Sequence, residues 1–354
     1  MKPGNDCQGF SLVLCTHNGT SRLQQTLRYL AALNIPENIS VEIIMIDNAS
    51  TDNTTGFSCN LWRELGSPFP LHILYEPRPG KGYAVETGYD AAKFEWMIIV
   101  DDDNWLCRDY LLHAARLIKE HPGAGIFQGC NDAVFECDPP AWIKALNLEH
   151  YMVIGSPVKK PGYFDQNYYG VWGAGMIIKN TDWQCLRKLG FAALTSKVPG
   201  KAAGEDVELA FGLLLMGRKI YYCQALHYRH FMPSSRLAWM ALKKNFATFG
   251  YADYYFFLYR MVFDAFDKQY VLSLKKLRRA FIIYFLKLLK TQGAWNNLKY
   301  LFIKEKAMYR LKLKQYYNAL YWFYRLSGNA MKDIQFIQGW MVPLLEKNPD
   351  GFKI

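Results

Sequence analysis

The sequence lacks any hydrophobic run long enough to cross a membrane. The first apolar run, Phe10 to Cys15, and the longest one near the C-terminus, Ala280 to Leu286, fall far short of the roughly 20 residues that a spanning helix needs. The first run also leads into a polar turn, so it does not read as a signal peptide. We therefore expect a cytoplasmic protein, either free in solution or peripheral on the inner face of the cytoplasmic membrane.

Several familiar signatures are missing as well. The eight cysteines are scattered without a C-x-x-C pair, which gives no indication of a zinc site or a disulfide framework and favours reduced thiols. Neither G-x-x-x-x-G-K-[ST] nor G-x-G-x-x-G occurs. The sequence therefore supports neither a P-loop nor a dinucleotide-binding fold.

Acidic residues are almost absent from one segment. Between Lys268 and Lys314 there are 13 basic residues and one acidic residue, Glu305, whereas the whole chain has a net charge of +11. The basic and apolar residues that alternate from Arg278 to Lys290 suit a helix on an anionic membrane surface. A helix packed on the rest of the protein with a solvated basic face explains them equally well. No nucleic-acid recognition motif is present, and we expect no nucleic-acid partner.

What the sequence does contain is a globular α/β pattern. Of its 354 residues 51% are hydrophobic and 16% aromatic, which excludes global disorder. Short aliphatic runs alternate with segments of helical periodicity, and this alternation predicts βαβ units with a mostly parallel, Rossmann-like sheet. The predicted strands are Phe10–Cys15, Val41–Ile46, Leu71–Tyr75 and Trp96–Val100, and the predicted helices are Leu23–Leu33 with Ser21 as its cap, Tyr83–Phe94 and Tyr110–Lys119.

The pattern changes after about residue 125. Strands are predicted at Gly125–Cys130, Gly170–Lys179 and Lys219–Tyr228, and a helix at Gly204–Met216, whereas the chain from Arg236 onward is almost wholly helical. We expect a catalytic domain over residues 1–235 and a basic helical region over residues 236–354.

Polar residues follow the predicted strands, at the edge where α/β sheets bind ligands. Asp101, Asp102 and Asp103 come directly after a buried strand, where a divalent cation and a diphosphate would offset their charge; an exposed acidic turn is the alternative. Asp47 suits a base or ribose contact, or an Asx-turn. Gly80, Lys81 and Gly82 offer backbone amides and a cation to a phosphate.

A second group of candidate residues lies later in the chain. Asp206 and its neighbour Glu205 head a predicted helix, where an aspartate is either a cap or a general base. His227 and His230 follow a predicted strand, and one of them suits a metal ligand.

Taken in order, these motifs resemble those of the family 2 glycosyltransferases, which have the GT-A fold. The resemblance covers about residues 8 to 250. It rests on Leu14–Gly19, Ile46–Asp52, Gly80–Gly82, Val100–Asn104, Gly173–Gly175 and Gly204–Asp206, with support from His230–Arg236. One departure is His17, which stands where the family usually has tyrosine.

The resemblance implies an inverting, metal-dependent transferase that moves a sugar from a nucleoside-diphosphate donor, with a UDP-sugar favoured, to a glycan or lipid-linked acceptor. Asp206 would be the catalytic base with Glu205 beside it, while Asp103, Asp101 and His230 would face Mn²⁺ or Mg²⁺. The implied nucleotide-sugar site consists of Thr16, His17, Asn18, Asp47, Asn48, Lys81, Asp101, Asp102, Trp172, Gly173, Ala174 and Gly175.

Three other classes of protein remain to be weighed. A nucleotidyltransferase would carry a glycine-rich signature after the first strand, which is missing. A glycosidase needs two facing carboxylates but no nucleotide pocket, so Asp47 and Lys81 would be unexplained. A non-catalytic nucleotide-sugar-binding protein on the same scaffold is the main alternative, and the joint presence of Asp103, Asp206 and His230 counts against it.

Overall fold

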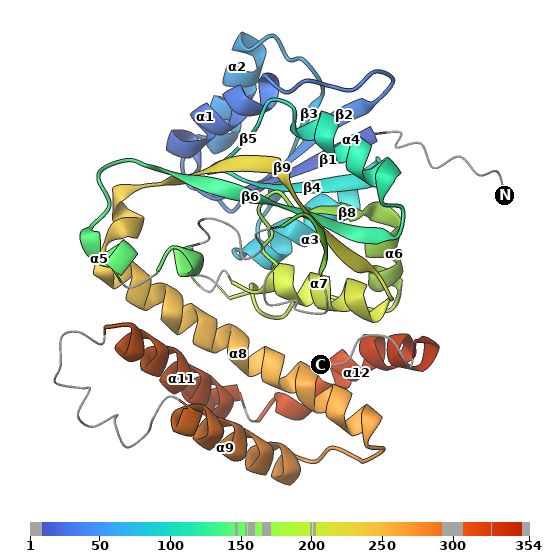
Figure 1. Cartoon of the computed structure of the whole chain (residues 1–354), viewed down its shortest axis with the longest axis vertical. Coiled ribbons are helices and arrows are strands. Elements are labelled where there is room, and N and C mark those ends of the chain that lie inside the picture. Colours follow the sequence, from blue (N-terminus) through green and yellow to red (C-terminus); the bar gives the residue numbers. More distant parts are fainter. Residues whose placement is uncertain are drawn as a thin grey trace.

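The structure is a computed structural model that describes residues 9–145, 148–152, 154, 160–164, 171–198, 200, 203–291, 307–326 and 328–348. These residues form one nine-stranded sheet with helices on both faces, and further helices follow at the C-terminal end (Figure 1). The strand order is β3-β2-β1-β4-β8-β6-β9-β5, with β7 paired to β9.

The four strands predicted first pair in parallel with one another. They are β1 (Gly9–Thr16), β2 (Ser40–Asn48), β3 (Leu71–Glu76) and β4 (Trp96–Asp101). The register places Thr16 beside Asp47 and Cys15 beside Asp101. The polar strand ends therefore meet at one edge of the sheet, as the sequence predicts.

The remaining strands make the sheet mixed. They are β5 (Asn104–Leu106), β6 (Ala124–Phe135), β7 (Gly162–Phe164), β8 (Ile177–Lys179) and β9 (Lys219–Met232). The prediction of a strand from Gly170 was wrong over residues 171–176, which form a turn in which Gly175 has φ +70°, a left-handed conformation; Gly170 itself lies outside the described residues. Conversely, β9 runs past Tyr228 and includes His230.

Helices cover both faces of the sheet because successive strand residues point to opposite sides. In β1, Phe10, Leu12 and Leu14 face one core, while Val13 and Cys15 face the other. The first core is covered by α1 (Thr20–Ala31), α2 (Thr54–Glu64) and α4 (Tyr110–Glu120), and the second by α3 (Lys81–Ala91), α6 (Asn180–Lys188) and α7 (Glu205–Leu215) (Figure 1).

One detail of the first helix differs from the prediction. Ser21 lies inside α1, and Gly19 occupies the N-cap position without a side-chain cap. Asp52 from the neighbouring loop accepts hydrogen bonds from the backbone N–H of Thr20 at 3.3 Å and from its hydroxyl at 2.6 Å. Asp52, 32 positions after Thr20, thus supplies the hydrogen-bond acceptor for the start of α1 that the sequence analysis expected from Ser21.

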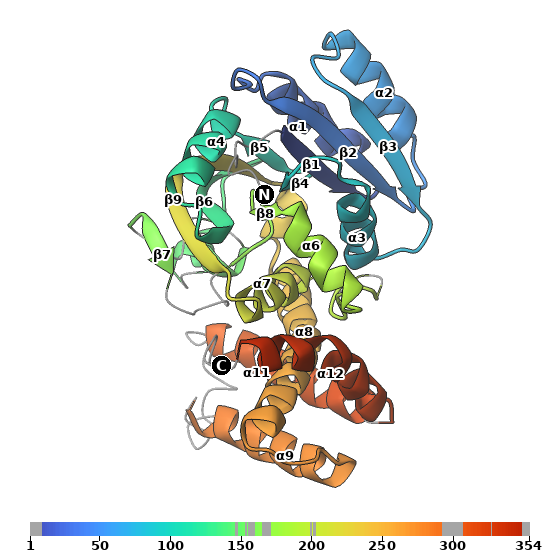
Figure 2. The same ribbon diagram turned by 90° about the vertical axis from the view of Figure 1, so that its right-hand side faces the viewer.

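The C-terminal region is helical, as predicted. It consists of α8 (Trp239–Asp267), α9 (Leu274–Thr291), α11 (Ala307–Leu326) and α12 (Ala330–Lys347), which lie beyond α7 in Figure 2. Trp340 of α12 packs against Phe191, Phe211 and Tyr259, so one hydrophobic core runs from the sheet into this region. The helical region therefore packs on the α/β domain, and the domain boundary at residue 235 stays a prediction.

The remaining described helical segments are short. They are α5 (Ala141–Ala145) and the 3-10 turns His150–Met152 and Ser234–Leu237. Within the ranges that the structure covers, no helix combines the length and the apolar character needed to span a bilayer.

Candidate functional site

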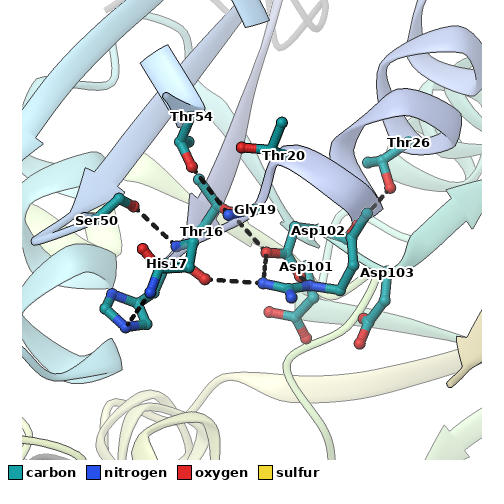
Figure 3. A network of polar contacts seen from close by, with 12 residues as sticks. Thr16, His17, Gly19, Thr20, Thr26, Ser50, Thr54, Asp101, Asp102 and Asp103 are labelled. Carbon is teal, nitrogen blue, oxygen red and sulfur yellow. Dashed lines mark hydrogen bonds and ion pairs between the residues drawn. The ribbon is translucent and has the colours of Figure 1, made fainter. Parts of the chain in front are cut away.

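The central residue of the aspartate triplet points into the protein. Asp102 accepts hydrogen bonds from the hydroxyl of Thr16 at 2.6 Å and from Arg22 Nε at 2.9 Å and Nη2 at 2.7 Å (Figure 3). Burial raises the pKa of Asp102, against the opposing pull of Arg22 and Thr16. Thr16 and Asp102, both predicted to bind nucleotide, thus join β1, β4 and α1 beneath the site.

The loop after β1 is bonded to the loop after β2. His17 donates from Nδ1 to the backbone oxygen of Asn48 at 2.8 Å, and Asn18 accepts at Oδ1 from the N–H of Thr51 at 2.7 Å. Asn18 also donates its own N–H to Ser50 Oγ at 2.9 Å. These bonds fix the backbone at the rim of the strand ends.

Asp47 and Asn48 anchor the second loop. Asp47 accepts at Oδ2 from the hydroxyl of Thr55 at 2.7 Å and at Oδ1 from the N–H of Ser50, three residues on, at 3.2 Å. The bond of an Asx-turn, to the residue two positions on, is found instead at Asp52, which accepts from the N–H of Thr54 at 3.1 Å. Asn48 donates to the backbone oxygen of Arg78 at 2.7 Å and accepts from the N–H of Gly80 at 2.9 Å. Asn48 therefore holds the loop that leads to Lys81.

The glycines around Lys81 do not offer their amides to a ligand, contrary to the sequence-based prediction. The N–H of Gly80 is bonded to Asn48, and the N–H of Gly82 donates to the backbone oxygen of Ser196 at 3.0 Å. A loop 114 residues away in the sequence uses the second of these donors. The segment is thus a packing junction between two loops.

Lys81 itself bridges two carboxylates. Its Nζ lies 2.9 Å from Asp101 Oδ1 and 3.2 Å from Glu205 Oε1. Burial lowers the pKa of Lys81, but the two carboxylates outweigh it and raise the pKa well above its usual range. A permanent positive charge therefore connects the end of β4 with the start of α7.

Glu205 and Asp206 begin α7 and differ in their electrostatics. Burial and then the neighbouring Glu205 raise the pKa of Asp206 to about 7, whereas Lys81 and a hydrogen bond from Ser196 outweigh burial and lower the pKa of Glu205. Gly204, with φ +105°, turns the chain into the helix. Glu205 is thus held ionised, while Asp206 exchanges its proton near neutral pH. Such a difference between two adjacent carboxyl groups is typical of acid–base sites.

The segment Trp172–Gly175 lies between β4 and Asp206. Gly173 donates its N–H to Asp206 Oδ2 at 2.7 Å, and a Cβ at Gly173 would lie 3.3 Å from that of Asp206. Gly175 donates its N–H to the backbone oxygen of Ile99 at 2.9 Å, and Trp172 and Ala174 are buried. The predicted sugar-pocket segment is therefore placed directly against the candidate base.

Asp103 and His230 converge on the far side of the triplet. Antiparallel pairing of β5 with β9 brings Asp103 Oδ1 to 3.7 Å from His230 Nε2, and Arg236 Nη1 lies 2.9 Å from Asp103 Oδ2. Burial raises the pKa of Asp103, but His230 and Arg236 reverse this and bring it well below its usual value. His227, by contrast, pairs with Asp132 at 3.0 Å, away from the triplet.

An ionised carboxylate and an imidazole fit a divalent metal ion such as Mn²⁺. Asp101, the third predicted ligand, is held by Lys81. Across the described ranges no three His, Cys, Asp or Glu side chains form a group able to hold an ion. A metal ion at Asp103 and His230 would therefore need further oxygen ligands from a bound molecule, and Arg236 Nη1 contacts both side chains, at 2.9 Å from Asp103 Oδ2 and 3.2 Å from His230 Nε2.

Three residues of this network were missed by the sequence. Arg22 bonds Asp102, Arg236 bonds Asp103, and Ser196 bonds Glu205. The two residues of each pair are nine to 133 positions apart and lie on different elements. No local sequence pattern therefore predicts these pairs. Arg236 alone had a signal, because it ends the segment His230–Arg236 that supported the resemblance.

The sequence is similar to those of known proteins. Residues 11–178 match the sequence model of the family described as Glycosyl transferase family 2. The succinoglycan biosynthesis protein ExoM of Rhizobium meliloti (strain 1021) is 24% identical over 246 residues, which cover 68% of this chain and 73% of ExoM. The poly-beta-1,6-N-acetyl-D-glucosamine synthase of Staphylococcus epidermidis is 27% identical over 122 residues, which cover 34% of this chain and 28% of the synthase.

The fold is also similar to that of a solved structure. The crystal structure of S. aureus TarS 1–349 in complex with UDP-GlcNAc has a TM-score of 0.52 at 15% identity, covering 97% of this chain and 92% of that one. The likeness extends over the helical C-terminal region and establishes a GT-A-like architecture.

Proposed function

Residues 11–178 are a family 2 glycosyltransferase domain, which makes this chain a glycosyltransferase, and on that premise we propose that it transfers a sugar from a nucleoside-diphosphate sugar to a hydroxyl group with inversion. The observation that carries the proposal is Asp206, a carboxylate with a pKa of about 7 set against the turn Trp172–Gly175. A UDP-sugar is the favoured donor, because the structurally similar TarS was crystallised with UDP-GlcNAc.

Asp206 would act as the general base. A base whose pKa lies near the working pH combines a sufficient ionised fraction with useful basicity. The N–H of Gly173 orients Oδ2, and the N–H of Val207 bonds Oδ1 at 2.8 Å. In this proposal Asp206 takes the proton of the acceptor hydroxyl as its oxygen attacks the anomeric carbon and the nucleoside diphosphate leaves from the opposite face. No covalent sugar–enzyme species is needed.

The strand ends would bind the donor. Asp47 suits a contact to the base, and Asp101, whose side chain is 25% exposed, suits the ribose side. Lys81 joins Asp101 to Glu205, so its charge lies between the proposed donor and acceptor ends. Thr16, Asn48 and Asp102 would act indirectly, by fixing the loops.

Asp103 and His230 would hold Mn²⁺ or Mg²⁺ together with diphosphate oxygens. When bound, the ion supplies positive charge that stabilises the departing diphosphate. Arg236 already places a cation at the same carboxylate and would assist in neutralising the leaving group.

The acceptor in this proposal is a hydroxyl of a glycan or of a lipid-linked glycan. Support comes from the relative ExoM, whose name assigns it to succinoglycan biosynthesis. Specificity for the sugar would be set at Trp172–Gly175, and pocket differences there are worth about 1–3 kcal/mol each.

A donor screen tests the proposal. UDP-GlcNAc, UDP-glucose, UDP-galactose and their GDP counterparts are added to the purified chain with Mn²⁺, and melting temperature and slow nucleoside-diphosphate release are recorded. We expect one donor to raise the melting temperature and to be hydrolysed, and both effects to disappear with a chelator. Stabilisation by nucleotide sugars without any turnover would instead favour the non-catalytic alternative.

A further inference from the structure

Exposed hydrophobic side chains gather on the two outer C-terminal helices. Fourteen large hydrophobic residues are exposed in the described part of the chain, and half of them lie on α9, on α11 or just before α9. The seven are Val271, Ile282, Ile283, Leu286, Tyr317, Tyr321 and Tyr324. Phe285 and Tyr317 bring the two helices into contact, with ring centroids 6.5 Å apart.

The faces of these helices that lie opposite the exposed side chains pack on the rest of the protein. Leu277 and Phe281 of α9 are buried, and Phe281 stacks on Phe323 of α11 with ring centroids 3.8 Å apart and packs against Phe257 of α8 at 5.0 Å. Ile282, Ile283 and Leu286 are 55%, 56% and 58% exposed. Packing on the protein therefore accounts for the inner face of α9 and leaves the outer face unexplained.

Charge on the same helices has one sign. The sequences of α9 and α11 contain six and four basic residues respectively, and no aspartate or glutamate. Lys275, Arg278, Arg279 and Lys287 of α9 are exposed. Nearly all of the chain's net charge of +11 thus belongs to the two helices that carry the exposed apolar side chains.

The occupant of such a surface must accept cations and aliphatic side chains together. A nucleic-acid backbone would pair with the cations but would leave Ile282, Ile283 and Leu286 without a partner. A second copy docked through the same helices would bring exposed cations such as Lys275, Arg278 and Lys287 of one copy against those of the other. An anionic lipid surface takes both, because phosphate headgroups attract Lys and Arg while Ile, Leu and Tyr enter the interface.

We propose that the outer face of α9, continued by the tyrosines of α11, docks this protein on an anionic membrane surface. The face is distant from Asp103: Arg236, which bonds Asp103, precedes α8, and Phe257, on which α9 packs, is 18 residues into that helix, roughly 27 Å from its start. Gly204, which precedes Glu205 and Asp206, instead lies against Ala252 and Phe256 of α8. Docking is therefore tested by vesicle binding, a measurement that does not depend on catalysis or on the proposed function.

The test is flotation of the full chain with vesicles of phosphatidylcholine alone or mixed with phosphatidylglycerol, at low and high salt. We expect binding to the anionic vesicles only, weakened by salt. The variant Lys275→Gln/Arg278→Gln/Arg279→Gln is expected to lower the partition constant on the order of 100-fold, at roughly fivefold for each charge. Ile282→Ser/Ile283→Ser is expected to lower it at least about tenfold through lost apolar burial.

A matched control removes three exposed basic residues from the other end of the molecule. Arg63→Gln/Arg116→Gln/Lys119→Gln has the same net charge as the first variant but changes α2 and α4, and its partition constant should stay within about twofold of the parent. Circular dichroism checks that all variants are folded. The proposal is overturned if the parent fails to float with anionic vesicles at low salt, if the control loses binding as strongly as the α9 variants, or if the α9 face supports only self-association or nucleic-acid binding.

Discussion

Replacing Glu205 with glutamine should move the pH dependence of turnover toward lower pH. Burial and then the charge of Glu205 raise the pKa of Asp206 from 3.8 to about 7, and Lys81 opposes them. Glutamine keeps an oxygen for Ser196 but removes the charge. Lys81 then loses one of the carboxylates that neutralise it, so its positive charge lowers the pKa of Asp206 further.

The pKa of Asp206 should fall by on the order of one unit, or about 1.4 kcal/mol, which is the effect of a neighbouring charge that is partly neutralised. It should not fall further, because Asp206 stays buried. A general base must be deprotonated, so turnover rises with pH through the pKa of Asp206. With a midpoint near 6 instead of 7, the Glu205→Gln variant would retain roughly half of its own maximal rate at pH 6, against about a tenth for the parent. The maximal rate itself should fall, because a base of lower pKa is weaker.

The assay follows nucleoside-diphosphate release from the donor found in the screen, between pH 5 and 9. A control variant is Glu95→Gln, which removes another carboxylate that is paired with a lysine, 3.1 Å from Lys179, at the opposite end of β4. Its midpoint should stay near 7. An unchanged or higher midpoint in Glu205→Gln would refute the electrostatic account of Asp206.

Three further predictions follow from the same contacts. Asp103→Asn should raise the Mn²⁺ concentration for half-maximal activity at least about tenfold, because it removes an ionised ligand; an unchanged metal titration would count against the assignment. Asn48→Ala should lower the free energy of unfolding in urea by about 1–2 kcal/mol, because one buried and two partly buried backbone groups between Glu76 and Gly80 lose their partner; a loss below about 0.5 kcal/mol would contradict this role. Asp206→Asn loses one of two backbone hydrogen bonds at all pH values, but its melting temperature relative to the parent should rise from about pH 4 to about pH 7 and then level off, since ionising Asp206 in the folded protein is unfavourable; a difference that does not change with pH would show that the pKa of Asp206 is not raised.

The sequence predicted the parts of the site that depend on strand order. The runs ending at Cys15, Ile46 and Val100 are short, aliphatic and followed by polar residues, and βαβ connectivity makes them parallel neighbours. Asp47 and the aspartate triplet therefore had to lie at one edge. The preference for His230 over His227 rested on the resemblance, and the structure places His230 beside Asp103.

The sequence could not predict which groups were already bonded within the protein. Asp102 has the same local context as its two neighbours, yet Thr16 and Arg22, about 80 residues away, take up its carboxylate. The amide of Gly82 is bound to Ser196 for the same kind of reason. Such pairings are set by tertiary packing between elements, which neither periodicity nor spacing encodes.

A comparison of Asp206→Asn with the parent for donor binding and turnover tests whether Asp206 is the base of a glycosyl transfer. Calorimetry with UDP-GlcNAc, or with whichever donor the screen identifies, measures affinity in the presence of Mn²⁺, and the rate of nucleoside-diphosphate release measures catalysis. If Asp206 is the base, the variant should bind the donor with an affinity within a few-fold of the parent and turn over on the order of 100-fold or more slowly. Near-normal turnover in Asp206→Asn would contradict it.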